Sequence, residues 1–191
     1  MNILVTGGCG FIGSHLVKSL IDKGFSVTIF DNFSNSLKIS EHSFLKNNVK
    51  VIEGDITNIE HIESATKNQN IVVHLAAKIS VLESTKNPLE TFRINVEGTK
   101  NVLSSCNKNN VKKIIVTSSA AVYGEINSSK EKLTENSKTI PISPYGESKL
   151  KMEKVIEEFC NQYNINYSIL RIFNIYGPNQ SDEYAGVITK F

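Results

Sequence analysis

Short runs of apolar residues alternate with longer amphipathic stretches along this chain. The short runs are rich in β-branched residues, which is typical of buried strands, whereas the longer stretches repeat apolar residues at the spacing of one helix face. This pattern predicts strands at residues 2–6, 26–30, 49–53, 71–75, 111–117 and 167–171. It predicts a first helix that includes residues 12–21 and stops at Gly24, and further helices near 59–67, from 87 to about 107 and from about 145 to 163.

The alternation of strands and helices predicts an α/β fold with a doubly wound, mainly parallel sheet and helices on both faces. Of the 191 residues, 40% are hydrophobic, which is enough for one core. The formal net charge of +2 offers no electrostatic basis for a nucleic-acid or anionic-membrane partner. No apolar run has the length of a membrane span, and we expect no signal peptide. The polar stretch 125–143 is predicted to be a surface loop.

Three glycines follow the first predicted strand, namely Gly7, Gly10 and Gly13 in a G-x-x-G-x-x-G spacing. In a strand–turn–helix unit, such glycines permit a tight turn, close approach of backbone to a pyrophosphate and close packing of helix on strand. The phosphates would meet free N–H groups at the positive end of the helix dipole. The alternative is a structural turn in which the glycines are incidental.

Acidic residues end the second and third predicted strands. Asp31 stands where a carboxylate accepts hydrogen bonds from an adenosine ribose and repels a 2′-phosphate, and the nearest cation behind it is Lys38. This arrangement predicts NAD rather than NADP. Asp55 has two interpretations, a contact with the adenine amino group or a cap on the following helix.

The candidate catalytic residues are Ser119, Tyr145 and Lys149. Tyr145 and Lys149 are four residues apart at the start of a predicted helix, so their side chains share a face. A free tyrosine, with a pKa of about 10, is a poor base at neutral pH. A lysine ammonium and a positive nicotinamide close by would favour the phenolate. Ser119, at the end of the fifth strand, would hold a substrate hydroxyl. A Y-x-x-x-K spacing also occurs by chance, so this interpretation depends on its combination with the glycine turn and Asp31.

The cysteines and histidines are scattered. Cys9, Cys106 and Cys160 lack a metal-ligand spacing and are predicted to be free thiols in a reducing compartment, which favours a cytoplasmic location. No metal site is predicted. His74 is interpreted as a packed residue at a strand end, and we assign it no catalytic role.

The chain resembles the extended short-chain dehydrogenase/reductase family, specifically its nucleotide-sugar epimerase/dehydratase branch. The matching stretches run nearly end to end: TGGCGFIGSHL, DNFSNS, GDI, HLAA, NVEGT, TSSAAVYG, PYGESK and RIFNIYGP. The resemblance implies a Rossmann-type domain over residues 1–191, with Ser119, Tyr145 and Lys149 as catalytic residues. It implies substrate contacts at Ser119, Tyr145 and Asn174. The NAD-binding residues that we expect are Gly7, Gly10, Phe11, Ile12, Gly13, Asp31, Asn32, Asn35, Ser36, Asp55, Ile56, Leu75, Ala76, Ala77, Asn95, Tyr145, Lys149 and Phe173.

The motif at the fifth strand distinguishes activities within that branch. Members that eliminate water resemble T-D-E-x-Y-G there, whereas this chain has Ser119-Ala120-Ala121 and no acid. The resemblance therefore implies 4-epimerisation of UDP-glucose and UDP-galactose through a 4-keto intermediate, with NAD regenerated. The alternatives are a nucleotide-sugar reductase or dehydratase of the same family, or a non-catalytic NAD-binding protein.

Members of that family continue well beyond a segment like 184–191, and their later part holds the sugar nucleotide. We therefore expect this chain to be a fragment that largely lacks the substrate domain. Members also commonly pair through two helices, which match residues 87–107 and 145–163, so the resemblance implies a homodimer.

Overall fold

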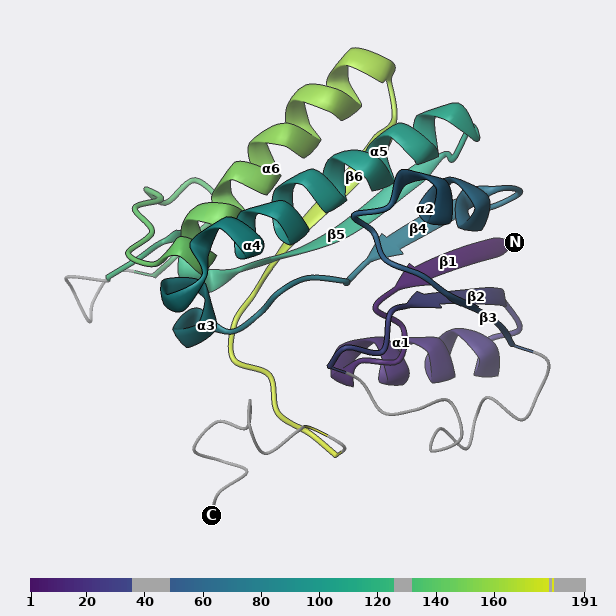
Figure 1. Ribbon diagram of the computed structural model, residues 1–191, viewed down its shortest axis with the longest axis horizontal. Coiled ribbons are helices and arrows are strands. Elements are labelled where there is room, and N and C mark those ends of the chain that lie inside the picture. Colours follow the sequence, from purple (N-terminus) through teal and green to yellow (C-terminus); the bar gives the residue numbers. More distant parts are fainter. Residues whose placement is uncertain (36–48, 126–131, 179, 181–191) are drawn as a thin grey trace.

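The computed structural model describes residues 1–35, 49–125, 132–178 and 180, and it is built around a parallel sheet (Figure 1). The sheet has the strand order β3-β2-β1-β4-β5-β6. The strands are β1 (Asn2–Thr6), β2 (Ser26–Asp31), β3 (Lys50–Glu53), β4 (Ile71–His74), β5 (Lys113–Ser119) and β6 (Asn166–Ile172). The predicted doubly wound parallel sheet is confirmed. Its order reverses between β1 and β4, and sheets of this kind bind ligands in the crevice at the carboxyl ends of such strands.

Helices cover both faces of the sheet. The helical elements are α1 (Phe11–Asp22), α2 (Ile59–Thr66), α3 (Val81–Lys86), α4 (Pro88–Phe92), a π-helical turn η3 (Arg93–Gly98), α5 (Thr99–Lys108), a 3₁₀ turn η4 (Ala120–Val122) and α6 (Pro144–Tyr163). Helix α1 lies on one face, and α2, α5 and α6 lie on the other (Figure 1). This separation follows from right-handed crossovers that run in opposite directions from the centre of the sheet.

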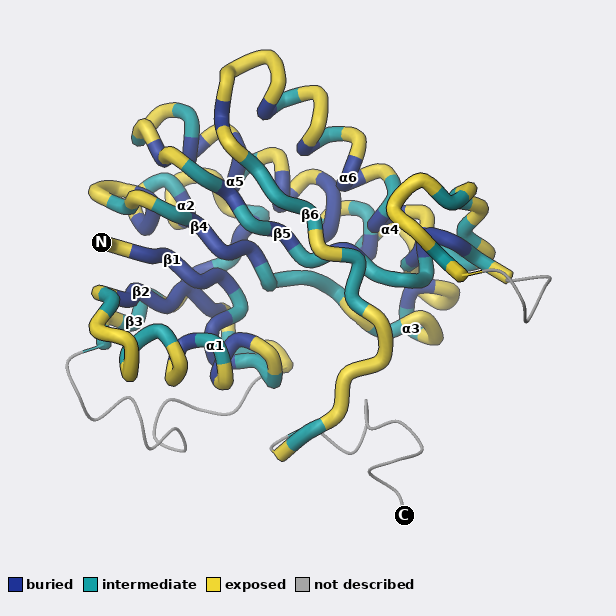
Figure 2. The backbone as a smooth tube through the Cα atoms, turned by 180° about the vertical axis from the view of Figure 1, so that it is seen from behind, coloured by how far each residue is buried: buried dark blue, intermediate teal, exposed yellow. Residues whose placement is uncertain are grey.

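The alternation of side chains along each strand divides the core into two clusters. On β1, Ile3 and Val5 pack with Val17 of helix α1, whereas Leu4 points to the opposite face. The core on that opposite face includes Phe30, Val72, Leu103, Ile114, Met152 and Ile156. Because the central strands are buried on both faces, they have the continuous apolar composition that predicted them. Figure 2 shows β1 and β4 buried at the centre and β6 only partly covered at the sheet edge.

Two parts of the helical prediction need correction. The helix predicted from 87 to about 107 consists of α4, the wider turn η3 and α5, and the sequence pattern did not indicate α3. Helix α3 is capped by Ser80, whose side chain accepts a hydrogen bond from Glu83 N. The fifth strand begins at Lys113 rather than at residue 111, because Val111 N–H still donates to Cys106 O at the end of α5. Of the predicted loop 125–143, residues 126–131 lie outside the described part.

Candidate active site

The glycine turn packs tightly against the exit of β4. Gly7 has a φ of 68°, and a Cβ there would lie 2.8 Å from Ala76 N. A Cβ on Gly13 would overlap Gly7 O, whereas one on Gly10 would meet that oxygen at 3.3 Å. Gly7 and Gly13 are therefore required by the turn itself, since the backbone segments touch where a side chain would stand.

The beginning of helix α1 is suited to an anion. Gly10 precedes the helix with no side-chain cap, and the first turn has no acidic residue. The other helices that follow loops on the described part of the chain are capped by the side chains of Asn58, Ser80, Asn87 and Ser143 and have a glutamate in the first turn. The N–H groups of α1 thus lack the side-chain acceptor that those helices have. This difference fits the predicted pyrophosphate site, because a free helix N-terminus attracts negative charge.

Asp31 connects the exit of β2 to the glycine turn. Its Oδ2 accepts a hydrogen bond from Cys9 N at 2.9 Å, and its Oδ1 accepts one from Phe33 N at 2.9 Å. A carboxylate has further lone pairs, so a ribose contact is compatible with these bonds and stays a prediction. Burial raises the pKa of Cys9 to about 12, and the charge of Asp31 acts in the same direction. Cys9 is therefore a thiol, and all three cysteines are buried and free.

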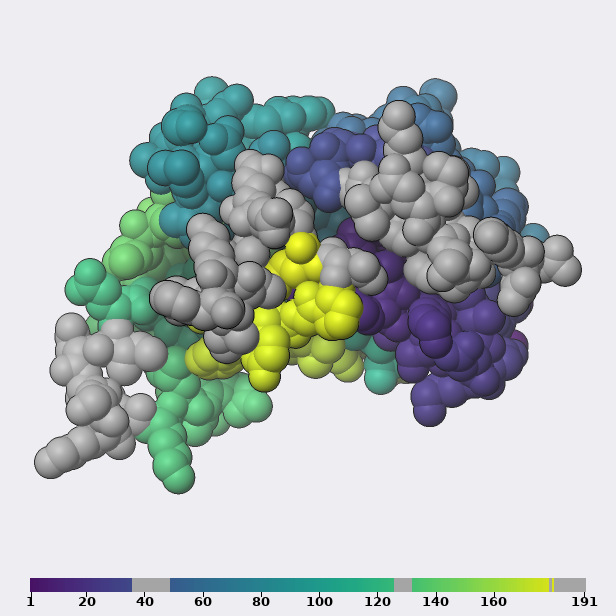
Figure 3. Space-filling view, turned by 90° about the horizontal axis from the view of Figure 1, so that it is seen from below, coloured from purple at the N-terminus to yellow at the C-terminus, as the bar shows by residue number. Residues whose placement is uncertain are grey.

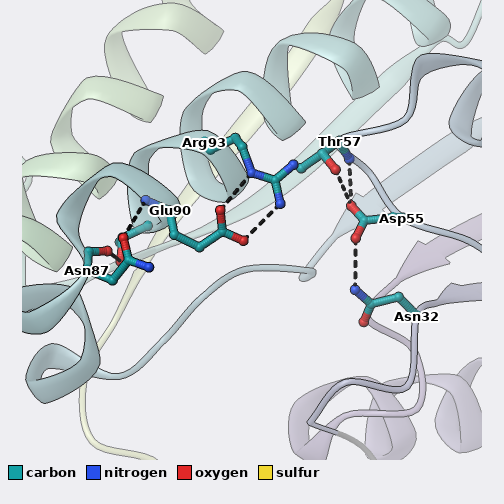
Figure 4. Close-up of polar contacts among 7 residues, drawn as sticks. Asn32, Asp55, Thr57, Asn87, Glu90 and Arg93 are labelled. Carbon is teal, nitrogen blue, oxygen red and sulfur yellow. Dashed lines mark hydrogen bonds and ion pairs between the residues drawn. The ribbon is translucent and has the colours of Figure 1, made fainter.

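Asp55 organises the exit of β3 (Figure 4). Its Oδ1 accepts hydrogen bonds from Thr57 N at 2.8 Å and Thr57 Oγ1 at 2.7 Å, and its Oδ2 accepts one from Asn32 Nδ2 at 3.2 Å. The N-cap of α2 is Asn58, so the helix-capping interpretation of Asp55 is wrong. Burial opposes ionisation of Asp55, but the bonds from Thr57 and Asn32 and the charge of Arg93 outweigh it and lower its pKa.

Arg93 lies beside the Asp55 cluster, and the sequence did not indicate it. It lies at the start of η3, where its guanidinium binds both carboxylate oxygens of Glu90 at 2.7 and 2.8 Å and faces the Asp55 cluster (Figure 4). The spacing of Glu90 and Arg93 on a helix that starts at Asn87 was a signal for this pair. Only the fold, however, brings β2, β3 and α4 to the same edge.

Asn95 connects the exit of β4 to helix α6. The residue is buried, and its side-chain amide accepts from Lys78 N at 2.8 Å and donates to Lys78 O at 3.0 Å. It also donates to Ser148 Oγ at 2.9 Å, and Ser148 Oγ donates to Tyr145 O at 2.7 Å. The structure thus places Asn95 beside helix α6, close to Tyr145, and its role in NAD binding stays a prediction. The sequence did not indicate its partners Lys78 and Ser148.

The three candidate catalytic residues meet between β5 and the start of α6. Ser143 caps the start of helix α6, because its hydroxyl accepts from Gly146 N at 3.1 Å, and Tyr145 therefore lies in the first turn. Burial raises the pKa of Tyr145, and a hydrogen bond with Ser119 opposes the rise. In the protein alone Tyr145 is therefore a neutral phenol at neutral pH.

Lys149 is buried one turn beyond Tyr145. Its Nζ donates to Thr117 O at 2.9 Å, which fixes the side chain against the end of β5. Burial lowers the pKa of Lys149 to about 8, while the charge of Glu153 acts in the opposite direction. The ammonium form therefore still prevails at neutral pH.

The remaining predicted site residues lie around the same edge of the sheet. Leu75, Ala76 and Ala77 are half-buried at the exit of β4, and Phe11 and Ile12 form the first turn of α1. Phe173 and Asn174 follow β6 and are exposed, as are Asn32 and Asn35. Ser36 lies outside the described residues. The segment after β6 reaches α1, where His15 Nε2 donates to Pro178 O at 2.9 Å, and Figure 3 shows these yellow residues beside the purple N-terminal ones.

A model of the NAD dependent epimerase/dehydratase family matches residues 3–191. The chain belongs to this family. A UDP-glucose 4-epimerase of Halalkalibacterium halodurans is 38% identical over 94% of the chain and 52% of its own length. Solved UDP-glucose 4-epimerase structures are also similar. The Thermotoga maritima structure with UDP-glucose has a TM-score of 0.89 and 37% identity, covering 100% of this chain and 61% of that one. The Thermus thermophilus complex with NAD has a TM-score of 0.87 and 32% identity, covering 95% and 58%.

Membership confirms the resemblance found in the sequence, and the family is NAD-dependent, as predicted. The chain spans between about half and three fifths of the length of the proteins just named. Within the described ranges, no group of three or more potential metal ligands comes together. None of the described helices is long and apolar enough to cross a membrane.

A buried ion pair supports helix α6, which carries the candidate residues Tyr145 and Lys149. Arg171 of β6 donates to Glu153 of α6 through Nε at 3.0 Å and through Nη2 at 2.8 Å. The Glu153 side chain is 4% exposed and that of Arg171 20%. Arg171 also donates to Tyr123 Oη at 3.1 Å and to Glu135 O at 2.9 Å. One guanidinium therefore joins α6, β6 and the loop after β5.

We expect Glu153→Gln to lower the free energy of unfolding by about 2 kcal/mol, because Arg171 would keep a partly buried charge without its counter-ion. The estimate is below that for a fully buried pair because Arg171 still reaches water. Urea denaturation measures the change. Glu157→Gln, at an exposed position one turn further along α6, is the matched control. Equal stabilities of the two variants would contradict a structural role for the pair.

Proposed function

We propose that this chain is the NAD-binding, catalytic portion of a nucleotide-sugar 4-epimerase that interconverts UDP-glucose and UDP-galactose. The observation that carries the proposal is the group at the end of β5, where Ser119 acts on the pKa of Tyr145 and Lys149, one turn further along α6, is fixed by its hydrogen bond to Thr117 O. The exit of β4 lies between this group and the glycine turn after β1, which is suited to a dinucleotide. The similarity to UDP-glucose 4-epimerases supports the same substrate class.

Each residue has a defined part in the proposed reaction. Tyr145 as phenolate takes the proton from the sugar 4-hydroxyl, and Ser119 holds that oxygen as the proton leaves. Bound NAD supplies the acceptor, and later the donor, of the hydride at sugar C4. The Lys149 ammonium holds the nicotinamide ribose and favours the phenolate, which burial alone disfavours. Asn174 contacts the substrate diphosphate.

The return step conserves the cofactor. After the 4-keto sugar turns over, Tyr145 returns the proton to its 4-oxygen. The cofactor bound at the glycine turn would supply the hydride to the other face of C4, so no NAD would be consumed. A dehydratase needs an additional acid and base at the positions of Ala120 and Ala121, and two methyl groups supply neither. This absence of acids favours epimerisation over elimination of water.

The decisive experiment incubates the native protein with UDP-galactose and NAD. We expect UDP-glucose to form with no net change in NADH absorbance. A second assay supplies a 4-keto sugar nucleotide and NADH. Continuous consumption of NADH in that assay would instead identify a reductase. Intact NAD binding with no conversion of any UDP-hexose would identify a non-catalytic protein.

We further propose that the protein is a homodimer that pairs through α4, η3, α5 and α6. A groove on this surface is lined by the apolar residues Leu89, Phe92 and Val96 and by the charged residues Arg93, Glu97, Lys100 and Lys151, and Leu89 is 84% exposed. A leucine this exposed beside apolar and charged groups is suited to an interface between subunits.

Leu89→Asp is therefore expected to convert dimers to monomers, because a carboxylate would be buried without a partner at the interface. Sedimentation equilibrium measures the change in mass. Leu170→Asp places the same substitution on β6, where the leucine is 49% exposed, and is the matched control. A dimer that survives Leu89→Asp would exclude this surface.

A cytoplasmic location is part of the same proposal. It rests on the three buried, unpaired thiols, which are typical of a reducing compartment.

A further inference from the structure

His74 ends strand β4 and is buried between two threonines. Its Nδ1 lies 2.7 Å from Thr6 Oγ1, and its Nε2 lies 3.0 Å from Thr99 Oγ1. The exposed fractions of His74, Thr6 and Thr99 are 2%, 0% and 1%. The imidazole therefore connects the end of β1 to the first residue of α5, and both of its nitrogens have partners.

The available protons determine the direction of each bond. The Thr99 hydroxyl donates its single proton to Asn95 O at 2.6 Å, because a carbonyl can only accept. Thr99 Oγ1 must then accept from His74 Nε2–H. Burial lowers the pKa of His74 to about 3, and the charge of Lys149 acts in the same direction, so the ring is neutral. His74 Nδ1 consequently has no proton and accepts the one from the Thr6 hydroxyl.

One end of this chain of bonds holds the backbone of the cofactor crevice. Thr6 Oγ1 accepts from Leu75 N at 3.2 Å and from Ala76 N at 3.3 Å. The same stretch is the surface against which Gly7 packs, since a Cβ on Gly7 would lie 2.8 Å from Ala76 N. The Thr6 hydroxyl thus helps to fix the backbone of Leu75 and Ala76, against which the glycine turn packs.

The other end reaches the catalytic helix through the π-helical turn. Thr99 N–H donates to Val96 O, whereas the Thr99 hydroxyl donates to Asn95 O. The hydroxyl thus reaches the carbonyl four residues back, which the Thr99 N–H would bond in a regular α-helix. The Asn95 amide in turn donates to Ser148 Oγ, which donates to Tyr145 O.

We propose that His74, held as the Nε2–H tautomer between Thr6 and Thr99, is a positioning residue that aligns the exit of β4 with Asn95 and the first turn of α6. With both nitrogens occupied, the ring transfers no proton to substrate and acts only through its neighbours. The catalytic role of Tyr145 rests on the proposed function. The His74 tautomer and its hydrogen bonds to Thr6 and Thr99 do not depend on that function.

The tautomer is tested directly by NMR of protein labelled with ¹⁵N-histidine at neutral pH. We expect the His74 Nε2 signal at the position of a protonated nitrogen and the Nδ1 signal at that of an unprotonated one. The variant His74→Gln identifies both signals by their loss. A protonated Nδ1 would overturn the proposal, whichever reaction the protein catalyses.

The positioning role is tested by comparing Thr99→Val, which removes the hydroxyl, with Thr99→Ser, which keeps it. In Thr99→Val, the side-chain amide protons of Asn95 should exchange with solvent about 10-fold faster than in Thr99→Ser or the natural protein. The kcat of the native protein should fall about 10-fold in Thr99→Val alone, with NAD affinity and KM unchanged.

Equal exchange rates and equal kcat in the two Thr99 variants would overturn the role. If Thr99→Val does not fold, Thr99→Ala makes the same comparison. A native protein that converts no nucleotide sugar would refute the proposed function, while the tautomer and the exchange rates would still decide the role of His74.

Discussion

Replacing Tyr145 by phenylalanine is expected to lower kcat by about 10³-fold, in the range that general acid–base groups contribute. The variant keeps the ring and loses only the hydroxyl that takes and returns the substrate proton. Dissociation constants for NAD should change little, because the phosphate turn and Lys149 are untouched. Steady-state kinetics with UDP-galactose and fluorescence titration with NAD measure the two quantities.

Tyr163→Phe provides the matched control for this experiment. Tyr163 ends the same helix, is 44% exposed, and lies far along α6 from the active site. Its substitution should leave kcat unchanged. A Tyr145→Phe variant that turns over at the natural rate would refute the assignment of the base, and the proposed reaction would need another proton acceptor.

Replacing Gly13 by alanine is expected to destabilise the protein by about 3 kcal/mol or more and to abolish NAD binding. The new methyl group would overlap Gly7 O and lie 2.7 Å from Gly8 Cα. Both are backbone atoms, so no rotation of a side chain relieves the clash, and helix α1 must move away from β1. Thermal denaturation measures the loss of stability, and calorimetric titration measures NAD binding.

Gly10→Ala is the stability control within the same turn. A Cβ on Gly10 would meet only Gly7 O, at 3.3 Å, so we expect a change within about 1 kcal/mol. If Gly13→Ala were as stable as Gly10→Ala, close packing of helix on strand would not be the reason for the third glycine.

The difference between these glycines shows where reasoning from sequence stops. The motif predicted one role for each glycine, but the distance from Gly13 to Gly7 O exists only once the turn is folded. Asp55 shows the same limit. Its position after a strand allowed either a contact with adenine or a cap on the next helix. The structure excludes the cap, because the Asn58 side chain accepts the hydrogen bonds of Glu60 N and His61 N at the start of α2.

The π-helical turn was invisible in the sequence for a physical reason. Apolar positions recur through residues 87–107 closely enough to indicate one continuous helix, and a single wider turn shifts their phase only slightly. Asn95 could therefore be placed near the active site only by resemblance. Its actual partners, Lys78 and Ser148, come from two other segments of the chain.

The sequence by itself determined the order of the six strands along the chain, the parallel sheet, the glycine turn and the shared face of Tyr145 and Lys149. These features depend on residues that are close along the chain, where periodicity and spacing report the geometry. The tertiary structure alone decided the pairing of Arg171 with Glu153, the placement of Arg93 beside Asp55, and the hydrogen bonds that join Thr6, His74 and Thr99. Such contacts join segments that only the folded sheet brings together, and their strength depends on burial, which no local pattern records.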